Sequence, residues 1–273
     1  MTVAKRYLRS KIVAPRLHDG LVVLSRLCDK LVESTDPLWL LSAPAGYGKT
    51  TLLVQALSKL DARTAWVSAD NDPVRFWAHV AAALLAEHDP LDELLDDLQP
   101  DRIQDLIDHL VVQIESERGR VVLVFDDVHE ISNREILEAL ARIMTRPPDN
   151  LTLVLATRAD PTLPIGRLRS QGRLMELRAE DLAFTAPEAA ALFGDSMTAA
   201  AVDSVLVRPE GWPATLKMLA VSAGPEDSHQ RLLDIPTDTQ SDLADLLAVE
   251  VLNAQSAEMR EFLVETSLLE RLE

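Results

Sequence analysis

Apolar residues in the first 180 positions follow two alternating spacings. Short runs that are apolar at nearly every position predict buried strands, and between them apolar residues recur every three or four positions, as in amphipathic helices. Buried strands that alternate with helices are typical of a parallel sheet covered by helices on both faces. The pattern predicts strands over 38–43, 64–69, 120–127, 150–158 and 173–178, and helices over 50–60, 73–88, 102–116 and 133–146.

After about residue 180 only helical patterns remain, which predicts a change of domain. We expect an α/β domain over 1–180, a small helical domain over 181–235 and the start of a third domain over 236–273. The polar, proline-containing stretch 225–241 is typical of a linker and supports the last boundary.

The charge of the chain argues against direct DNA binding. Its 273 residues carry a formal net charge of −17, and affinity for DNA comes largely from Lys and Arg that neutralise phosphates. The one basic concentration is segment 5–16, which forms either a DNA-binding arm or, as we favour, a short arm that packs on the acidic body of the protein. Nucleic acid is therefore not expected as a direct partner.

Two observations bear on where the protein resides. No apolar run reaches the ~18 residues of a membrane span, so no membrane partner is expected. The single cysteine, Cys28, cannot form an internal disulfide, and we interpret it as a small buried residue on a helix. Both observations predict a soluble protein of the reducing cytoplasm.

A glycine-rich loop follows the first predicted strand and opens the first predicted helix. Its sequence, APAGYGKTT, has Ala43 where the common phosphate-binding pattern G-x-x-x-x-G-K-[ST] begins with glycine. The glycines allow backbone N–H groups to turn inward around a phosphate, the lysine can reach the β- and γ-phosphates, and the threonine hydroxyl can ligate Mg²⁺. The candidate nucleotide-binding residues are Ala45, Gly46, Tyr47, Gly48, Lys49, Thr50 and Thr51.

Two aspartates end the third predicted strand, in the sequence VVLVFDD. A carboxylate beside a phosphate-binding loop can coordinate Mg²⁺, and Asp126 fits this role. Asp127 can orient or deprotonate the water that attacks the γ-phosphate, although its short side chain makes slow hydrolysis plausible. The alternative, that both are solvated turn residues, is disfavoured because the lysine loop precedes them in the chain.

Arg158 ends the fourth predicted strand, which we expect to lie between the two strands that carry these motifs. That place would direct Arg158 to the γ-phosphate like an internal arginine finger. A surface arginine in a salt bridge is the alternative. His129, just past the acids, either contacts the nucleotide or caps a turn, and both interpretations stay open.

These segments together resemble one protein family. They are similar to the N-terminal ATPase module of the MalT-like, large ATP-binding LuxR-type transcriptional regulators, which belong to the STAND class of signal-transduction ATPases. A small residue ahead of P-A-G-Y-G-K-T-T and the D-D-x-H acid motif are typical of that family. Five segments occur in the family's order across nearly the whole chain: SAPAGYGKTTLL, AWVSADNDPVRFWAHVAAAL, VLVFDDVHEI, LTLVLATRADPTLPIGRLRSQGRLMELRAEDLAFTAPEAAALF and GWPATLKMLA.

The resemblance implies an ASCE/AAA+-like P-loop domain, then a small helical domain, then a winged-helix domain. It also implies a closed, ADP-bound resting monomer that inducer and ATP open, after which the protein self-associates and activates transcription. By the same resemblance Lys49, Thr50 and Thr51 would hold phosphates and Mg²⁺, Asp126 and Asp127 would be the acid pair, Arg158 the sensor, Pro213 a residue packed near the nucleotide, and Arg16 part of the segment on the adenine side.

The sequence departs from the family at its end. Family members continue with a helical-repeat sensor region and a C-terminal helix-turn-helix, whereas this sequence stops inside the expected winged-helix domain. Contacts with an inducer and with DNA would belong to those further regions. The sequence is then either a piece of a longer protein or a truncated member.

The leading functional prediction is a switch controlled by ATP or ADP together with Mg²⁺, with slow ATP hydrolysis. Two alternatives share the same loop and sheet. One is an interaction module that holds ADP without turnover. The other is a small-molecule P-loop kinase, which would need an acceptor pocket and a mobile lid that the helical region does not obviously supply.

Overall fold

The computed structural model describes residues 7–18, 20–85, 95, 98–194, 202, 206 and 211–223. Contacts divide the chain into two compact units, Met1–Ala183 and Phe184–Glu273. The predicted third domain, 236–273, and the end of the predicted helix, 86–88, lie outside the described residues. The domain limits drawn from the sequence stay predictions.

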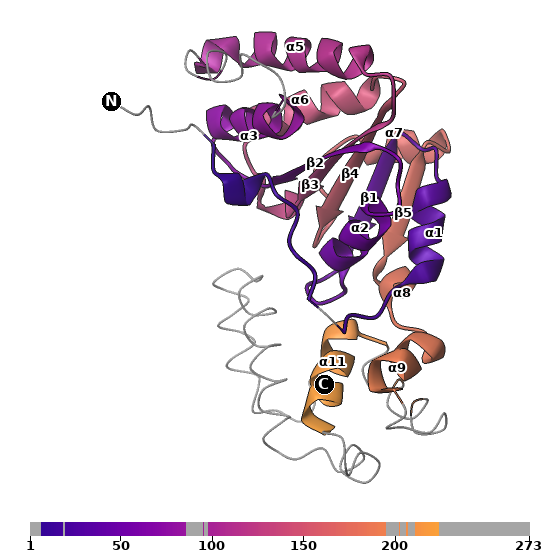
Figure 1. Ribbon diagram of the computed structural model, residues 1–273. Coiled ribbons are helices and arrows are strands. Elements are labelled where there is room, and N and C mark those ends of the chain that lie inside the picture. Colours follow the sequence, from indigo (N-terminus) through magenta and orange to yellow (C-terminus); the bar gives the residue numbers. More distant parts are fainter. Residues whose placement is uncertain are drawn as a thin grey trace, which may run out of the picture. The chain divides into compact units, whose positions relative to one another are not determined.

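The first unit is built on five parallel strands in the order β2-β3-β4-β1-β5 (Figure 1). This confirms the predicted α/β fold and the place of the fourth strand between the two motif strands. Each strand lies within two residues of its predicted range. The strands are β1 (Leu38–Ser42), β2 (Arg63–Ser68), β3 (Val121–Asp126), β4 (Leu151–Thr157) and β5 (Leu174–Arg178).

Helices cover both faces of this sheet (Figure 1). Successive side chains of a strand point to opposite faces, and all residues of β1 are buried. Leu38 and Leu40 belong to the core on one face, which leaves Trp39 and Leu41 for the other. This explains why the strands read as continuous apolar runs. The helices are α3 (Pro73–Leu85), α5 (Ile103–Ser116) and α6 (Arg134–Thr145) on the first face, and α1 (Ser25–Glu33) and α2 (Lys49–Leu57) on the second.

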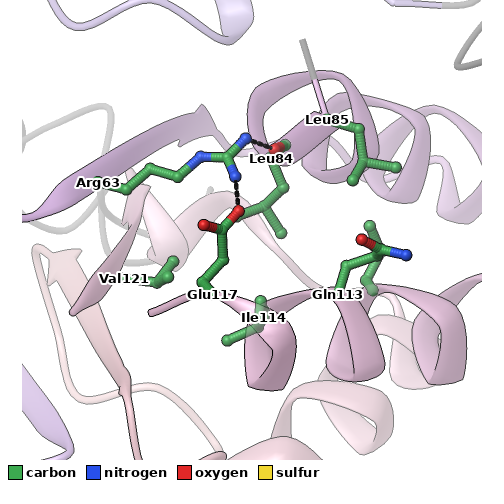
Figure 2. Close-up of a pocket in the computed structure, with 8 residues that line it drawn as sticks. Arg63, Leu84, Leu85, Gln113, Ile114, Glu117 and Val121 are labelled. Atoms are coloured by element: carbon green, nitrogen blue, oxygen red, sulfur yellow. Dashed lines mark hydrogen bonds and ion pairs between the residues drawn. The ribbon is translucent and has the colours of Figure 1, made fainter. Parts of the chain in front are cut away.

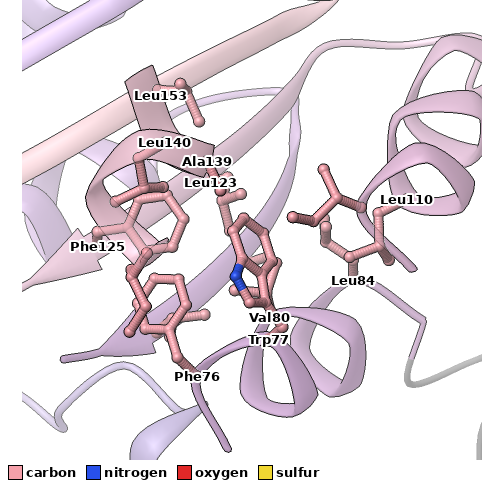
Figure 3. Close-up of a cluster of buried hydrophobic side chains, with 14 of the residues drawn as sticks. Phe76, Trp77, Val80, Leu84, Leu110, Leu123, Phe125, Ala139, Leu140 and Leu153 are labelled. Carbon is pink, nitrogen blue, oxygen red and sulfur yellow. The ribbon is translucent and has the colours of Figure 1, made fainter. Parts of the chain in front are cut away.

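The core under α3, α5 and α6 is organised around aromatic rings (Figure 3). Phe76 lies 5.5 Å from Phe125 in a stacked arrangement, and its ring meets that of Trp77 edge-on at 5.3 Å between centroids. All three side chains are fully buried, and Trp66 on β2 is buried as well. The stacking of Phe76 on Phe125 fixes α3 against β3.

At the amino edge of the sheet, one arginine joins three elements (Figure 2). The guanidinium of Arg63, at the start of β2, donates to the carboxylate of Glu117 after α5 and to the carbonyl of Leu84 in α3. The cavity beside it is about 10 Å³ and mainly apolar, which is room for about one water molecule. We therefore assign this pocket to packing.

Several short elements were not predicted, because segments of three to six residues show too little periodicity. The nine-residue helix α1 was given no range from the sequence, although Cys28 was expected to be a buried residue on a helix, and it is fully buried on α1. The other missed elements are the 3-10 helices η1 (Arg9–Lys11), η2 (Pro100–Arg102) and η3 (Val128–Glu130), and the α-helices α7 (Ile165–Ser170) and α8 (Ala179–Leu182).

The described part of the second unit is helical, as predicted. Its elements are α9 (Ala186–Phe193) and α11 (Pro213–Ala223). Thr185 caps α9 together with Glu188, and Phe193 packs with Leu216 and Leu219 in a small apolar cluster. Among the helices of the described residues, none has the length and apolar character needed to cross a membrane.

Candidate nucleotide-binding site

The predicted loop residues, the acid pair and Arg158 gather where three neighbouring strands of the first unit end. β1 ends at Ser42, directly before the glycine-rich loop, and β3 ends at Asp126. β4 lies between them and ends at Thr157, directly before Arg158. Because all strands are parallel, these ends share the carboxyl edge of the sheet, where ligands bind in open α/β folds.

Two glycines carry the turn of the loop. Gly46 and Gly48 have φ angles of 76° and 75°, which side-chain-bearing residues rarely adopt, and Gly48 forms the N-cap of α2. Ala43 is not among the residues with positive φ; its N–H instead extends the β1–β4 ladder by donating to the Thr157 carbonyl at 3.2 Å. The first position of the loop therefore does not need glycine.

Lys49 directs its charge into this loop. The side chain is only 9% exposed, and Nζ donates to the carbonyls of Ala43 at 2.6 Å and Pro44 at 2.9 Å. The residue opens α2, so its ammonium group and the helix N-terminus place positive potential at the same point. This arrangement suits the phosphates of a nucleotide.

Thr50 and Asp126 form the candidate Mg²⁺ site. The Thr50 hydroxyl donates to Asp126 Oδ2 at 3.1 Å, which joins the start of α2 to the end of β3. A hydroxyl and a carboxylate are hard oxygen ligands of the kind Mg²⁺ takes, with water and phosphate oxygens completing its shell. The two side chains thus fit the metal that the loop implies.

Burial raises the pKa of the Asp126 carboxyl, and the negative charge of Asp127 raises it further. Hydrogen bonds from the Thr50 hydroxyl and the Asp127 N–H, together with the charge of Lys49, oppose the shift. Asp126 is only 6% exposed. A cation next to this carboxylate would offset the unfavourable burial of its charge.

Asp127 has an unusual backbone. With φ 58° and ψ 36° it is the one non-glycine residue of the described chain in the left-handed region. Its N–H donates to Asp126 Oδ1 at 3.0 Å, and its carbonyl accepts from the Glu130 N–H at 2.9 Å. Such conformations concentrate at functional sites and persist only when the surroundings hold them.

Arg158 and His129 also lie at the carboxyl edge of the sheet, just after β4 and β3. Arg158 is exposed, directly after β4. Burial lowers the pKa of His129; the charges of Asp127 and Glu130 oppose this effect, while those of Arg158 and Lys49 add to it. His129 is therefore close to the candidate phosphate-binding and acidic groups. Among the residues that the structure describes, its buried Nδ1 has no hydrogen-bond partner.

A polar link between three strand ends escaped the sequence analysis. Asp160 Oδ1 accepts from the Ser42 hydroxyl at 3.0 Å, and both Asp160 oxygens pair with the Arg178 guanidinium, Oδ2 at 2.9 Å. Arg178 also pairs with Glu176. This ties the ends of β1, β4 and β5 together beside the loop. The only available signal was a polar residue at each strand end.

The remaining predicted residues lie on different elements. Ala45 and Tyr47 lie half-buried in the loop, and Thr51 lies in the first turn of α2. Arg16 is exposed on the N-terminal arm of the first unit. Pro213 is buried in the second unit, where it begins α11. The roles that the resemblance implies for Arg16 and Pro213 stay predictions.

The comparisons with known proteins bear on this site directly. Residues 32–160, which include the loop, the acid pair and Arg158, match the AAA domain family model. The HTH-type transcriptional regulator MalT of Serratia proteamaculans is 35% identical over 279 aligned residues, which cover 95% of this chain and 30% of that protein. This chain is a relative of the MalT regulators. It spans about 30% of the length of the curated relatives it matches.

Solved structures show the same fold. A STAND protein with a tetratricopeptide repeat sensor from Pyrococcus horikoshii aligns with a TM-score of 0.56 at 16% identity, covering 94% of this chain and 36% of that one. The Aeropyrum pernix ORC1 protein, solved in complex with DNA, aligns with a TM-score of 0.51 at 16% identity, covering 90% and 71%. The resemblance to MalT-type proteins and the AAA+-like fold are thus confirmed, and an AAA domain with an intact lysine loop implies nucleotide binding.

Proposed function

We propose that this chain is the nucleotide-dependent switch module of a LuxR/MalT-type transcriptional regulator. The observation that carries the proposal is the strand order β3-β4-β1, which brings Lys49, Thr50, the acid pair and Arg158 to one edge of the sheet. The similarity to MalT regulators supports the regulatory context.

In this proposal each side chain has a separate task. Lys49 and the N–H groups of the loop bind the phosphates, and Thr50 and Asp126 hold Mg²⁺, which neutralises phosphate charge when bound. Asp127 orients the attacking water and accepts its proton as the new bond to the γ-phosphorus forms and the bond to the β–γ bridging oxygen breaks. Arg158 binds the γ-phosphate oxygens. Hydrolysis to ADP and phosphate is slow, because the short Asp127 side chain limits its reach.

The switch follows from a difference in contacts. ATP offers a γ-phosphate to Arg158 and Asp127 and ADP does not, so the two nucleotides bias a conformational equilibrium differently. We propose that the equilibrium is between closed and open arrangements of the two units, with Arg16 on the adenine side and Pro213 near the nucleotide. Self-association belongs to the ATP state. Inducer and DNA would act through regions of the relatives that this chain does not span.

The central test is Lys49→Ala, with titration calorimetry of ADP and of ATP with Mg²⁺. We expect the affinity for both nucleotides to fall about 10- to 150-fold, the range for loss of a charged hydrogen bond. Lys59→Ala is the matched control, since Lys59 lies just after the same helix in an exposed ion pair with Asp29 at 3.4 Å. Unchanged affinity in Lys49→Ala would remove the loop from the proposal.

A further inference from the structure

One asparagine side chain joins the loops that follow β2 and β3. Asn71 Oδ1 accepts from the N–H groups of Ser132 at 2.8 Å and Asn133 at 3.1 Å, and from the Ser132 hydroxyl at 3.4 Å. Asn71 Nδ2 donates to the Glu130 carbonyl at 2.8 Å. The acceptor and the donor of a single amide group thus bind three of the four positions 130–133 in the turn between β3 and α6.

The turn that Asn71 holds by these hydrogen bonds begins with Asp127. Glu130 ends the short helix η3, and its N–H donates to the Asp127 carbonyl at 2.9 Å. The same residue is held by Asn71 through its own carbonyl. Glu130 is therefore the connection between the Asn71 amide and the left-handed backbone of Asp127.

Asn71 is itself well anchored. Ala69, two residues earlier, donates its N–H to the Asp126 carbonyl at 3.0 Å. Asp72, the next residue, accepts from the Arg75 N–H at 2.8 Å at the start of α3, and Arg75 pairs with Asp70 at 3.0 Å. On the other side Asn133 caps α6 by accepting from the Glu135 N–H at 2.9 Å. The loop that carries Asn71 is thus fixed to the start of α3, and the turn that it binds is fixed to the start of α6.

We propose that Asn71 is a positioning residue for Asp127: it holds the turn after β3 so that Asp127 keeps its left-handed backbone and directs its carboxylate to the attacking water. The inference rests on the proposed function, because it needs ATP hydrolysis as the reaction. Aspartate tolerates the left-handed region better than most residues, but this region is still less favourable than the right-handed one, so contacts with neighbours help to hold it. The side-chain hydrogen bonds of Asn71 help to hold the turn after β3, and with it the backbone of Asp127. These bonds are additional to the backbone bonds within the helices and strands.

The test compares Asn71→Ala and Asn71→Asp with the parent protein. Asn71→Asp keeps the acceptor for Ser132 and Asn133 but loses the donor to Glu130, so it separates loop stability from the link to Asp127. We expect both variants to lower kcat about 10- to 100-fold, since small misplacements of a catalytic group have effects of that size. The Kd for ADP should change less than about twofold, because ADP offers no γ-phosphate for Asp127. Amide exchange at Glu130 should become faster in both.

Asn150→Ala is the matched control. Asn150 precedes β4 at the opposite edge of the sheet, where its Nδ2 donates to the carbonyls of Ile114 at 2.6 Å and Glu117 at 3.1 Å. Its removal should lower stability and leave kcat within about twofold, because it positions no candidate site residue.

A double variant gives a second readout. In an Asp127→Asn background, Asn71→Ala should reduce kcat no further, since both changes act through the same carboxylate.

The outcomes separate this inference from the proposed function. A parent protein that hydrolyses ATP, with an Asn71→Ala variant of equal kcat, overturns the inference alone. Additive effects of Asn71→Ala and Asp127→Asn also overturn it, since they show that Asn71 acts elsewhere. A parent protein that neither binds nor hydrolyses ATP overturns the proposed function, and this inference with it.

Discussion

The carboxylate of Asp126 lies almost fully buried at the end of β3, where burial and the neighbouring Asp127 raise its pKa. An acid whose pKa is raised in the folded state binds its proton more tightly there than in the unfolded chain. Its ionised form therefore opposes folding at neutral pH. The Thr50 hydroxyl and Lys49 reduce this effect only in part. The same unfavourable charge is what a bound Mg²⁺ would neutralise.

Asp126→Asn should therefore raise Tm at pH 7, by about 2–4 °C for each kcal/mol gained in a domain of this size. The gain should shrink as pH falls through the raised pKa towards the ordinary Asp value, because the parent carboxyl then becomes protonated in the folded state. Calorimetric unfolding at several pH values measures this gain in Tm. Glu115→Gln, an exposed acid on α5, is the control and should show no such trend. A gain independent of pH would assign the effect to packing.

Asp127→Asn separates binding from hydrolysis. The amide removes the proton acceptor but preserves the size of the side chain, so ATP affinity should stay within about threefold while turnover falls about 100-fold or more. Phosphate release measured beside calorimetric binding gives both values. Normal turnover in this variant would exclude Asp127 as the base.

At the scale of elements, the N-terminal arm is held to α3 and β2 by two specific bonds. His79 of α3 is fully buried and accepts the Leu8 N–H at Nε2, 3.0 Å away. Lys11 Nζ donates to the Ala69 carbonyl, directly after β2, at 2.7 Å. These contacts support the interpretation that the basic arm packs on the protein body. The accepting nitrogen must carry no proton, so the contact with Leu8 requires neutral His79.

The arm contact should weaken in acid. Burial lowers the pKa of His79; Asp70 opposes this shift, while Lys11 and Arg75 add to it. The unfolded chain therefore takes up a proton at a higher pH than the folded protein does. Stability is then fully present above the ordinary His value of about 6.5 and declines as pH falls below it. Urea unfolding at pH 5.5 and 7.5 should show this decline, and His79→Leu should remove it. His109→Gln, at an exposed position on α5, should behave like the parent.

For the whole molecule, nucleotide and stability should be linked. A ligand that binds only the folded state at 100 times its Kd adds about 2.7 kcal/mol to the free energy of unfolding. Because the candidate loop and acid pair lie in the first unit, ATP with Mg²⁺ should raise the Tm of that unit. At the same nucleotide concentration the Lys49→Ala variant, with its roughly 10- to 150-fold weaker affinity, should gain only about 0.3–1.4 kcal/mol and a correspondingly smaller rise, whereas Lys59→Ala should respond like the parent. An equal rise in Lys49→Ala would place the nucleotide elsewhere.

Much of the fold and of the candidate site was predictable because the signals are local. Apolar runs specify strands through the side chains of five to seven consecutive residues. Lys49 and Thr50 follow their glycines directly, and Asp126 and Asp127 end their strand. Even the place of Arg158 was predicted, because the order of strands follows from the resemblance of the motifs to P-loop proteins.

The sequence by itself determined which residues carry charge, hydroxyl groups and backbone freedom, and which segments form strands and helices. Only the tertiary structure decided how these groups are held. The bond from Asn71 to Glu130 spans 59 positions, and that from Leu8 to His79 spans 71. The left-handed backbone of Asp127 and the Ser42–Asp160–Arg178 link likewise depend on neighbours that other elements supply. Such contacts have no local signature, because they exist only once the parallel sheet brings distant strand ends to one edge.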